Sequence, residues 1–155
     1  MPPKAGSYLY PFLQDIPLFS GLPPEDSARF FCIGKTHIVK GGRSLVTEGR
    51  GGGDLHIIVS GRVEVLKRAP KGGSKVLATL GCGDLFGEMS ALDGGAYSAT
   101  VRAQGDCAVH IIRGRDLHAF LKKNPADAYP ILTNFIKILS ARLRHMNQQA
   151  AKPAK

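Results

Sequence analysis

The residue types best suited to chemistry in this chain gather in one glycine-rich stretch, residues 83–101. Two glycine-flanked turns there bracket a segment that is long enough for only one or two helical turns, Glu88 to Leu92. A short helix with unpaired N-terminal amides, beside glycines that let a ligand approach the backbone, can cradle an anion. A plain connection between two strands explains the same spacing, so the pattern alone leaves both interpretations open.

Other catalytic and metal-binding patterns fail when they are tested against the sequence. Residues 34–36 match the end of a phosphate-binding P-loop, but Arg29 stands where its first glycine belongs. Gly81, Gly83 and Gly87 fit a dinucleotide fingerprint poorly, because the third glycine arrives one residue late. The five histidines lack metal-ligand spacing, and the carboxylates are too scattered for an acid/base pair. The sequence therefore predicts no catalytic residue, no metal site, no cofactor and no enzyme.

Composition indicates one folded domain. The chain has 155 residues, 43% of them apolar, and no apolar run approaches the roughly 20 residues that span a bilayer. Residues 1–7 do not resemble a signal peptide, so we expect a cytoplasmic protein without a membrane partner. The formal charge of +9 invites nucleic acid, but the basic residues are dispersed without interleaved aromatics, and no direct DNA binding is expected. The three cysteines are widely spaced, which favours buried thiols over disulfides.

Glycine spacing predicts a β-rich middle flanked by helices. Of the 19 glycines, 17 fall between Gly34 and Gly114, and short β-type segments alternate with them. These segments are 36–39, 44–47, 55–60, 62–67, 75–80, 98–103 and 107–112. Seven or eight short strands at this spacing are typical of a barrel or sandwich.

Helical patterns occupy both flanks of the predicted strands. A helix is expected from Pro23 toward a stop at Gly34, a second over 115–123, and a third over 126–146. Pro130 is compatible with the third helix only in its first turn. The apolar stripe of that helix comprises Ala128, Leu132, Phe135, Leu139, Leu143 and Met146, widened by Ile131 and Ile138. Its near-heptad spacing suits a homodimer seam, and core packing explains the same residues equally well.

Three segments, in order, resemble one known family. Residues 86–92 (FGEMSAL) and 98–101 (SATV) are similar to the phosphate-binding cassette of the cyclic nucleotide-binding domain family, to which the regulatory subunit of protein kinase A and the catabolite activator protein belong. Residues 16–22 and 53–65 resemble the family's N-terminal segment and its third and fourth strands. The resemblance extends over about Leu13 to Met146.

The resemblance implies a fold and a domain layout. It implies a mainly β fold with flanking helices, namely an eight-stranded, jelly-roll-like β-roll with N-terminal helices and two C-terminal helices. One domain would occupy residues 13–147, after an N-terminal lead-in of residues 1–12 and before a C-terminal tail of residues 148–155.

The resemblance also implies roles for individual residues. Glu88 would accept a hydrogen bond from the ribose 2′-hydroxyl, and Ser98 would donate to phosphate or purine. The backbone amides of residues 87–90 and of Ala99 would face the cyclic phosphate, and a residue within 143–147 would cap the base. The predicted ligand-binding residues are Phe86, Gly87, Glu88, Met89, Ser90, Tyr97, Ser98 and Ala99.

This chain departs from the family pattern at the phosphate itself. The family has Pro-Arg before Ser-Ala-Thr, whereas this sequence has Ala96 and Tyr97. Arginine makes two charge-assisted bonds to one phosphate, and tyrosine offers a single neutral donor. Losing such a pair at a buried phosphate costs about 2 to 5 kcal/mol, and each 1.4 kcal/mol weakens binding about tenfold. Arg102 lies four residues beyond Ser98 along a strand, too far to substitute.

Two functions follow as expectations. In the first, the chain is a regulatory module that senses cAMP, cGMP or a related anionic ligand and signals through a protein partner. In the second, the fold is degenerate, binds no ligand, and serves as a protein-protein interaction scaffold through its long helix and basic surface. Only residues 147–155 follow the long helix, too few for a helix-turn-helix, which also argues against promoter recognition.

Overall fold

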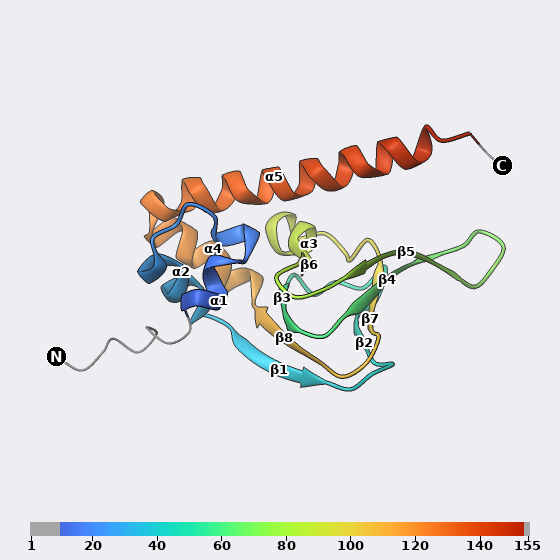
Figure 1. Cartoon of the computed structure of the whole chain (residues 1–155), viewed down its shortest axis with the longest axis horizontal. Coiled ribbons are helices and arrows are strands. Elements are labelled where there is room, and N and C mark those ends of the chain that lie inside the picture. Colours follow the sequence, from blue (N-terminus) through green and yellow to red (C-terminus); the bar gives the residue numbers. More distant parts are fainter. Residues whose placement is uncertain (1–9, 154–155) are drawn as a thin grey trace. The chain divides into compact units, whose positions relative to one another are not determined.

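The computed structural model describes residues 10–153, which fall into two compact units. One unit is continuous, Arg29–Lys123, and holds all the strands. The other combines the chain before Arg29 with the chain from Asn124 onward. Figure 1 follows the chain through these elements. No helix within residues 10–153 is long and apolar enough to cross a bilayer.

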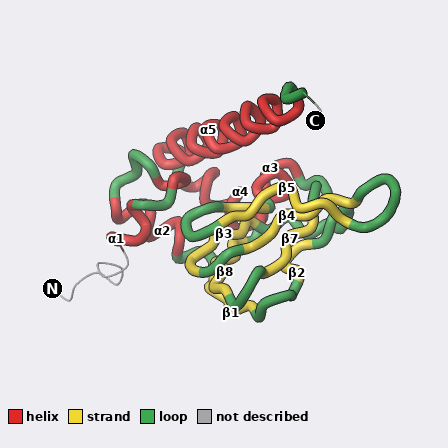
Figure 2. Tube along the Cα trace, turned by 45° about the vertical axis from the view of Figure 1, so that its right-hand side comes forward, coloured by secondary structure: helices red, strands yellow, loops and turns green. Residues whose placement is uncertain are grey.

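The strands of the first unit form two antiparallel sheets of four (Figure 2). They are β1 (Lys35–Val39), β2 (Ser44–Val46), β3 (Leu55–Ser60), β4 (Val63–Arg68), β5 (Ser74–Leu80), β6 (Leu85–Phe86), β7 (Thr100–Ala103) and β8 (Cys107–Ile112). The order is β1-β8-β3-β6 in one sheet and β2-β7-β4-β5 in the other. The predicted eight-stranded β-roll with flanking helices is thereby confirmed.

Alternating side chains place the core between the sheets. In β4 the side chain of Val63 is buried, whereas that of Glu64 lies on the opposite face and pairs with Arg102 of β7 at 3.0 Å. The buried residues that meet between the sheets are Val46, Ile58, Val63, Phe86, Tyr97, Val101, Ala103, Cys107 and Val109. Most come from strands predicted from the sequence. The sequence did not predict strand β6 as a separate element, because two residues are too few to show the alternation of apolar and polar residues that indicates a strand.

The helices agree with prediction in type and approximate position. They are α1 (Tyr10–Gln14), the 3₁₀ turn η1 (Pro17–Phe19), α2 (Pro24–Phe31), α3 (Glu88–Asp93), α4 (Gly114–Lys123) and α5 (Pro125–Ala150). The first-turn placement expected for Pro130 is wrong, because α5 begins at Pro125 and Pro130 is its sixth residue. A proline there has no N–H for the carbonyl of Ala126, so α5 contains one internal gap in its hydrogen bonds.

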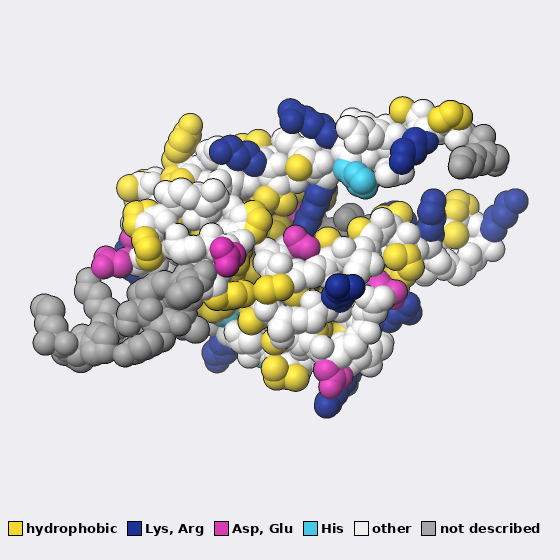
Figure 3. All heavy atoms as spheres, in the orientation of Figure 1, with side chains coloured by type: hydrophobic (Ala, Val, Ile, Leu, Met, Phe, Trp, Pro, Cys, Tyr) yellow, Lys and Arg dark blue, Asp and Glu magenta, His cyan; other side chains and the backbone are white. Residues whose placement is uncertain are grey.

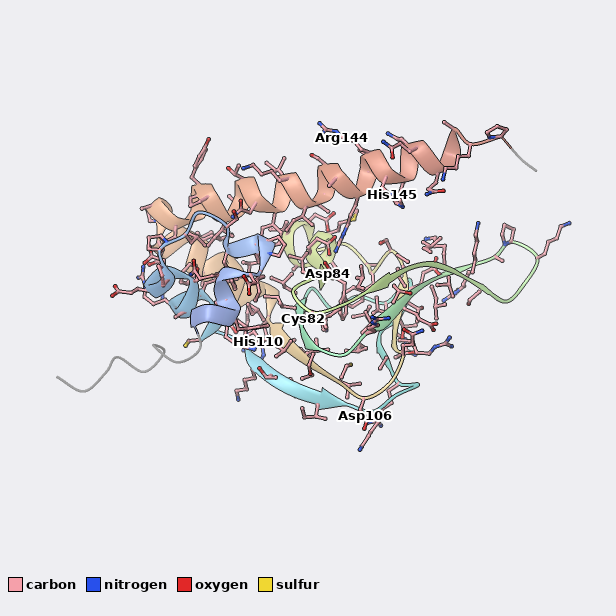
Figure 4. The ribbon with its side chains drawn as sticks, viewed as in Figure 1. Cys82, Asp84, Asp106, His110, Arg144 and His145 are labelled. Atoms are coloured by element: carbon pink, nitrogen blue, oxygen red, sulfur yellow. The ribbon has the colours of Figure 1, made fainter. Side chains whose placement is uncertain are left out.

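A buried histidine connects α2 to the sheet in the first unit. His110 on β8, labelled in Figure 4, stacks on Phe31 with ring centroids 3.6 Å apart. Its Nε2 must donate to the Phe31 carbonyl, 2.6 Å away, because a carbonyl only accepts. Neutral Nδ1 then accepts from the Thr36 hydroxyl at 2.9 Å. Burial lowers the pKa of His110, which keeps the ring in this neutral form.

The cysteines differ from expectation. Cys107 is buried between the sheets as predicted, but Cys32 and Cys82 are exposed. Cys32 follows the last residue of α2, and Cys82 lies in the turn between β5 and β6 (Figure 4), so neither position belongs to a packed face. The preference of cysteine for buried sites failed here because turn positions overrode it.

In the second unit, one asparagine holds the N-terminal turn to the long helix. The side chain of Asn134 on α5 is buried, and its Nδ2 donates to the carbonyls of Leu18 and Ser20, each at 2.8 Å. These carbonyls lie at the end of η1, where a helical turn leaves acceptors without partners. The two hydrogen bonds therefore replace the missing partners and fix η1 against α5.

We expect Asn134→Asp to destabilise the protein by about 3 kcal/mol or more. An ionised aspartate has no hydrogen to donate, and it would place a buried charge against two carbonyl oxygens. Urea unfolding of the variant and of the exposed control Asn147→Asp measures the difference. Equal stability of the two variants would show that the two hydrogen bonds contribute little.

Candidate functional site

The candidate site begins at Gly87, between β6 and α3. Gly87 has a φ of +76°, in the left-handed region that favours glycine. A Cβ built there would lie 2.5 Å from the Asp54 carbonyl oxygen and 3.2 Å from Nδ1 of His56. Conformation and space therefore both require glycine, and the chain can turn from the sheet directly into a helix. The stretch from Phe86 to Ala99 is called the cassette below.

Helix α3 presents its first turn inside the cassette. Glu88 is its first residue and is only 6% exposed, whereas Met89 is 51% exposed. The first amide of α3 with a helical partner in the structure is that of Ala91, which bonds to the Gly87 carbonyl. Amides at the start of a helix can serve an anion, and whether those of residues 88–90 form the expected cradle stays a prediction. A helix this short exerts only a small dipole, and ligand binding there depends on neighbouring groups.

Ser90 holds the cassette to the loop before β3. Its hydroxyl accepts from the Gly53 amide at 3.1 Å and donates to the Gly95 carbonyl at 2.5 Å. Both its hydrogen and one lone pair are therefore used within the protein. Of the Ser90 groups, the backbone amide is the one that remains a candidate for ligand contact.

Tyr97, in place of the family's arginine, is packed into the core. Its ring is 9% exposed, and a Cβ on Gly52 would lie 2.5 Å from it. Its hydroxyl accepts from the Asp54 amide at 3.2 Å, and burial raises its pKa, so it stays neutral. Its own backbone amide donates to the Arg50 carbonyl at 2.9 Å. Tyr97 therefore serves packing, and it brings no positive charge to the cassette.

The end of the cassette is held by residues that the sequence did not single out. Lys67 of β4 donates to the Ser98 carbonyl at 2.7 Å, and its Nζ lies 2.8 Å from a carboxylate oxygen of Glu48. Lys67 holds the pKa of Glu48 below its ordinary value, and the Arg68 amide adds to the effect. Lys67 is 19 positions from Glu48 and 31 positions from Ser98, so no local pattern could have revealed these contacts.

His56 of β3 supports the cassette from beneath. Its ring stacks on Phe86 at 4.6 Å and meets Tyr97 edge-on at 6.5 Å. Nδ1 donates to the Asp54 carbonyl at 3.1 Å. Burial lowers the pKa of His56 to about 4, and the bond to Asp54 offsets only part of that effect. No local pattern indicates these contacts, because the partners of His56 come from β6 and from the far end of the cassette.

A cavity of about 420 Å³ adjoins the cassette on the side of α4. It is lined by Gly52, Gly53, Asp54, Ser90, Ala91, Gly94, Arg113, Gly114, Arg115 and His118. His118 donates from Nε2 to the Ala91 carbonyl at 3.0 Å, which joins α4 to α3. Among the predicted ligand-binding residues, Ser90 is the one that lines it. Within the described part of the chain, no group of three or more His, Cys, Asp or Glu is arranged to hold a metal.

The predicted site residues all lie in the cassette, but their surroundings in the structure differ from one residue to the next. Phe86, Glu88, Ser90 and Tyr97 are buried, whereas Met89 and Ser98 are exposed and Ala99 is half-buried. The predicted base-capping stretch, residues 143–147, lies on α5 in the other unit. Whether these residues contact a ligand stays a prediction.

The fold and the cassette define a class, a β-roll with a short, glycine-started helix between two of its strands. The family model for the cyclic nucleotide-binding domain matches residues 36–124. The chain therefore belongs to the cyclic nucleotide-binding domain family.

Proteins similar to this chain include a receptor for cyclic AMP and a solved cyclic nucleotide-binding domain. It is 33% identical over 128 residues to the cyclic AMP receptor protein of Thermus thermophilus, covering 83% of this chain and 57% of that protein. A cyclic nucleotide-binding domain from Methylobacillus flagellatus has a TM-score of 0.83 at 25% identity, over 98% of this chain and 86% of that one. The chain spans about half the length of the curated relatives it matches, or less.

A third relative comes from Trypanosoma brucei. It is the regulatory subunit of a protein kinase A described as cAMP-independent, in a variant with three substitutions that is bound to cAMP in its A site. It has a TM-score of 0.71 and 25% identity to this chain, over 94% of this chain and 51% of that one.

Acid is expected to destabilise the fold through His56. Between about pH 6.5 and 4, His56 is protonated in the unfolded chain but neutral in the folded protein, because its pKa is lower there. The free energy of unfolding therefore falls as the pH drops through this window. The full contribution is about 3 kcal/mol. Urea unfolding at several pH values measures it.

Two variants separate His56 from the other titrating groups. His56→Phe keeps the stack on Phe86 but cannot titrate, so its unfolding free energy should depend less steeply on pH. Burial also lowers the pKa of His110, which is unchanged in all three proteins. The control His145→Phe makes the same substitution at an exposed position. If the slopes of all three proteins coincide, His56 is not responsible.

Proposed function

We propose that this chain is a non-catalytic regulatory module that senses a cyclic nucleotide, cAMP or cGMP, or a related anionic ligand, and passes the signal to a protein partner. The observation that carries the proposal is Glu88, a carboxylate buried at the start of the cassette helix in a domain of this family. The resemblance assigns the ribose hydroxyl to this carboxylate, and an ionised carboxylate is a strong acceptor for a hydroxyl.

The proposed ligand contacts keep the assignments made from the resemblance. Glu88 would bind the ribose, the amides of residues 87–90 and of Ala99 would bind the phosphate, and Ser98 would donate from its exposed hydroxyl. The ring of Phe86 and the side chain of Met89 would flank the site. Tyr97 would fill the volume that arginine occupies in other members, and it would contribute packing instead of charge.

Loss of the arginine sets the expected affinity. Without a cation at position 97, the phosphate would be bound by backbone amides and hydroxyls, which are weaker partners for an anion than a guanidinium group. The Trypanosoma brucei relative supports this reasoning, because a protein described as cAMP-independent binds cAMP after three substitutions. We therefore propose weak cyclic-nucleotide binding that an arginine would strengthen.

A second function, a scaffold that self-associates through α5, is favoured by one observation. Large apolar side chains of α5 are exposed at spacings of three and four, namely Tyr129, Leu132, Ile136, Leu143 and Met146, with half-buried Leu139 completing the series. This is the repeat of a two-helix coiled-coil seam. A second copy of this chain, with the same repeat, is the partner that such a seam fits.

The stripe predicted for this helix divides into two faces. Of the predicted residues, Ile131 and Phe135 are buried in the unit that contains α5, whereas Leu143 is 57% exposed and Met146 is 62% exposed. Ile136, which the prediction did not include, is 64% exposed. Core packing therefore accounts for one face and leaves the other for a partner. Phe135 belongs to the buried face, so changing it would test folding and not association.

The nucleotide proposal predicts a gain of affinity on changing Tyr97→Arg. Calorimetric titration with cAMP and cGMP should show weak, saturable binding by the wild type and at least about tenfold tighter binding by the variant, because a charge-assisted pair to phosphate is regained. Glu88→Ala should weaken binding in both backgrounds.

The matched control for that experiment is Tyr129→Arg. It makes the same substitution at a tyrosine that is 78% exposed on α5, so it adds the same charge away from the cassette. If both arginine variants raise the affinity equally, the gain comes from net charge and not from the cassette. If neither the wild type nor Tyr97→Arg binds either nucleotide, the sensing proposal is wrong.

The scaffold proposal predicts that Ile136→Asp yields a folded monomer. A carboxylate in a coiled-coil seam loses its hydration when the helices pair, whereas in the monomer it stays in water. Sedimentation of the wild type, Ile136→Asp and the neighbouring exposed control Lys137→Glu measures the association. A wild type that is already monomeric at high concentration would contradict self-association.

A further inference from the structure

The part of the cassette that carries Ser98 and Ala99 lies just before a strand. Strand β7 begins at Thr100, so these residues are not paired within a sheet. Backbone bonds to the turn after β2 hold Tyr97 from both sides, since its carbonyl accepts from the Gly49 amide and its amide donates to the Arg50 carbonyl, each at 2.9 Å. The next carbonyl, that of Ser98, is bound by a side chain, the ammonium group of Lys67.

Lys67 is itself fixed by Glu48. The carboxylate of Glu48 lies 2.8 Å from Nζ of Lys67, and its second oxygen accepts from the Arg68 amide at 3.0 Å. The guanidinium group of Arg68 also donates to the Glu48 carbonyl at 3.2 Å. One carboxylate therefore faces two cations, so the cluster of Glu48, Lys67 and Arg68 keeps a net positive charge.

The hydrogen bond from Lys67 to the Ser98 carbonyl also affects the Ala99 amide, because both groups belong to one peptide. The Ser98 carbonyl and the Ala99 amide belong to one peptide unit, which is planar and trans, so the N–H points opposite to the C=O. Holding the carbonyl toward Lys67 therefore aims the Ala99 N–H away from Lys67. A cation on the carbonyl also polarises the peptide and makes its N–H a stronger donor.

We propose that Lys67 is a positioning residue of the anion site, which orients and polarises the Ala99 amide toward the ligand's phosphate and supplies part of the positive charge that Tyr97 does not. The inference rests on the proposed function, because Ala99 is assigned to the phosphate there. It differs from a direct contact, since Lys67 acts through the Ser98–Ala99 peptide. Although the cassette lacks the arginine, the ammonium group of Lys67 thus lies on the carbonyl side of the Ser98–Ala99 peptide.

The test has one readout without ligand and one with it. In ¹⁵N–¹H spectra of the full chain, Lys67→Met should move the Ala99 amide proton upfield, because the carbonyl loses its cation and the N–H becomes less polarised. In calorimetric titration with cAMP, the same change should weaken binding about three- to tenfold, in the wild type and in Tyr97→Arg. Lys67→Arg, which keeps a cationic donor, should restore both readouts.

Lys75→Met is the matched control. Lys75 lies directly opposite Lys67 in the β4–β5 pair and is exposed, so its loss removes the same charge from nearly the same place. Figure 3 shows lysine and arginine side chains along this hairpin. If Lys75→Met has the same effect as Lys67→Met on cAMP affinity, bulk charge is responsible and the proposal is overturned.

The two proposals fail in different ways. An Ala99 amide that does not shift in Lys67→Met overturns the role of Lys67, whatever the nucleotide does. Amide shifts spread over the whole β-roll also overturn it, because Lys67 would then be supporting the fold. If no variant binds cAMP but the Ala99 amide responds as expected, the proposed nucleotide ligand is wrong and the positioning of this amide by Lys67 is supported.

Discussion

The cassette depends on how closely its backbone approaches the loop before β3. A Cβ on Gly87 would lie 2.5 Å from the Asp54 carbonyl oxygen, the Gly53 amide donates to Ser90, and the Asp54 amide donates to Tyr97. A side chain at Gly87 would push these elements apart. Because of this contact, a six-residue helix too short to be stable alone is held with its first turn in a defined direction.

The same packing explains what kind of site this chain has. Tyr97 fills the core beside the loop, and its hydroxyl uses the Asp54 amide. The cassette therefore keeps its shape without the arginine that the family pattern places there. The shape of the backbone in this chain does not depend on a positive charge at position 97. The positive charge nearest to the end of the cassette comes from β4, where Lys67 holds the Ser98 carbonyl. Anion binding in this chain would rest on backbone amide donors, one of which belongs to the peptide whose carbonyl is bound by Lys67.

Long-range contacts limited what could be predicted. The strands, α4 and α5 follow from glycine turns and from apolar periodicity, which are local properties of the chain. Local properties do not predict the two-residue strand β6, the buried contacts of His56 or the ion pair of Glu48 and Lys67. Each of these depends on contacts between residues that lie far apart in the sequence. The predicted stripe on α5 shows the same limit, since its residues belong to two faces with different surroundings, and only burial distinguishes Phe135 from Leu143.

The sequence by itself determined the family, the β-roll and the position of the cassette, because these depend on short motifs and on spacing along one chain. It also located the departure at position 97, since a missing residue type is visible without coordinates. The tertiary structure decided what replaces the arginine: Tyr97 is buried in the core, and Lys67, 31 positions before Ser98, binds the Ser98 carbonyl. Hydrogen bonds and burial depend on distances in space, and residues far apart in sequence meet only once the sheets have formed.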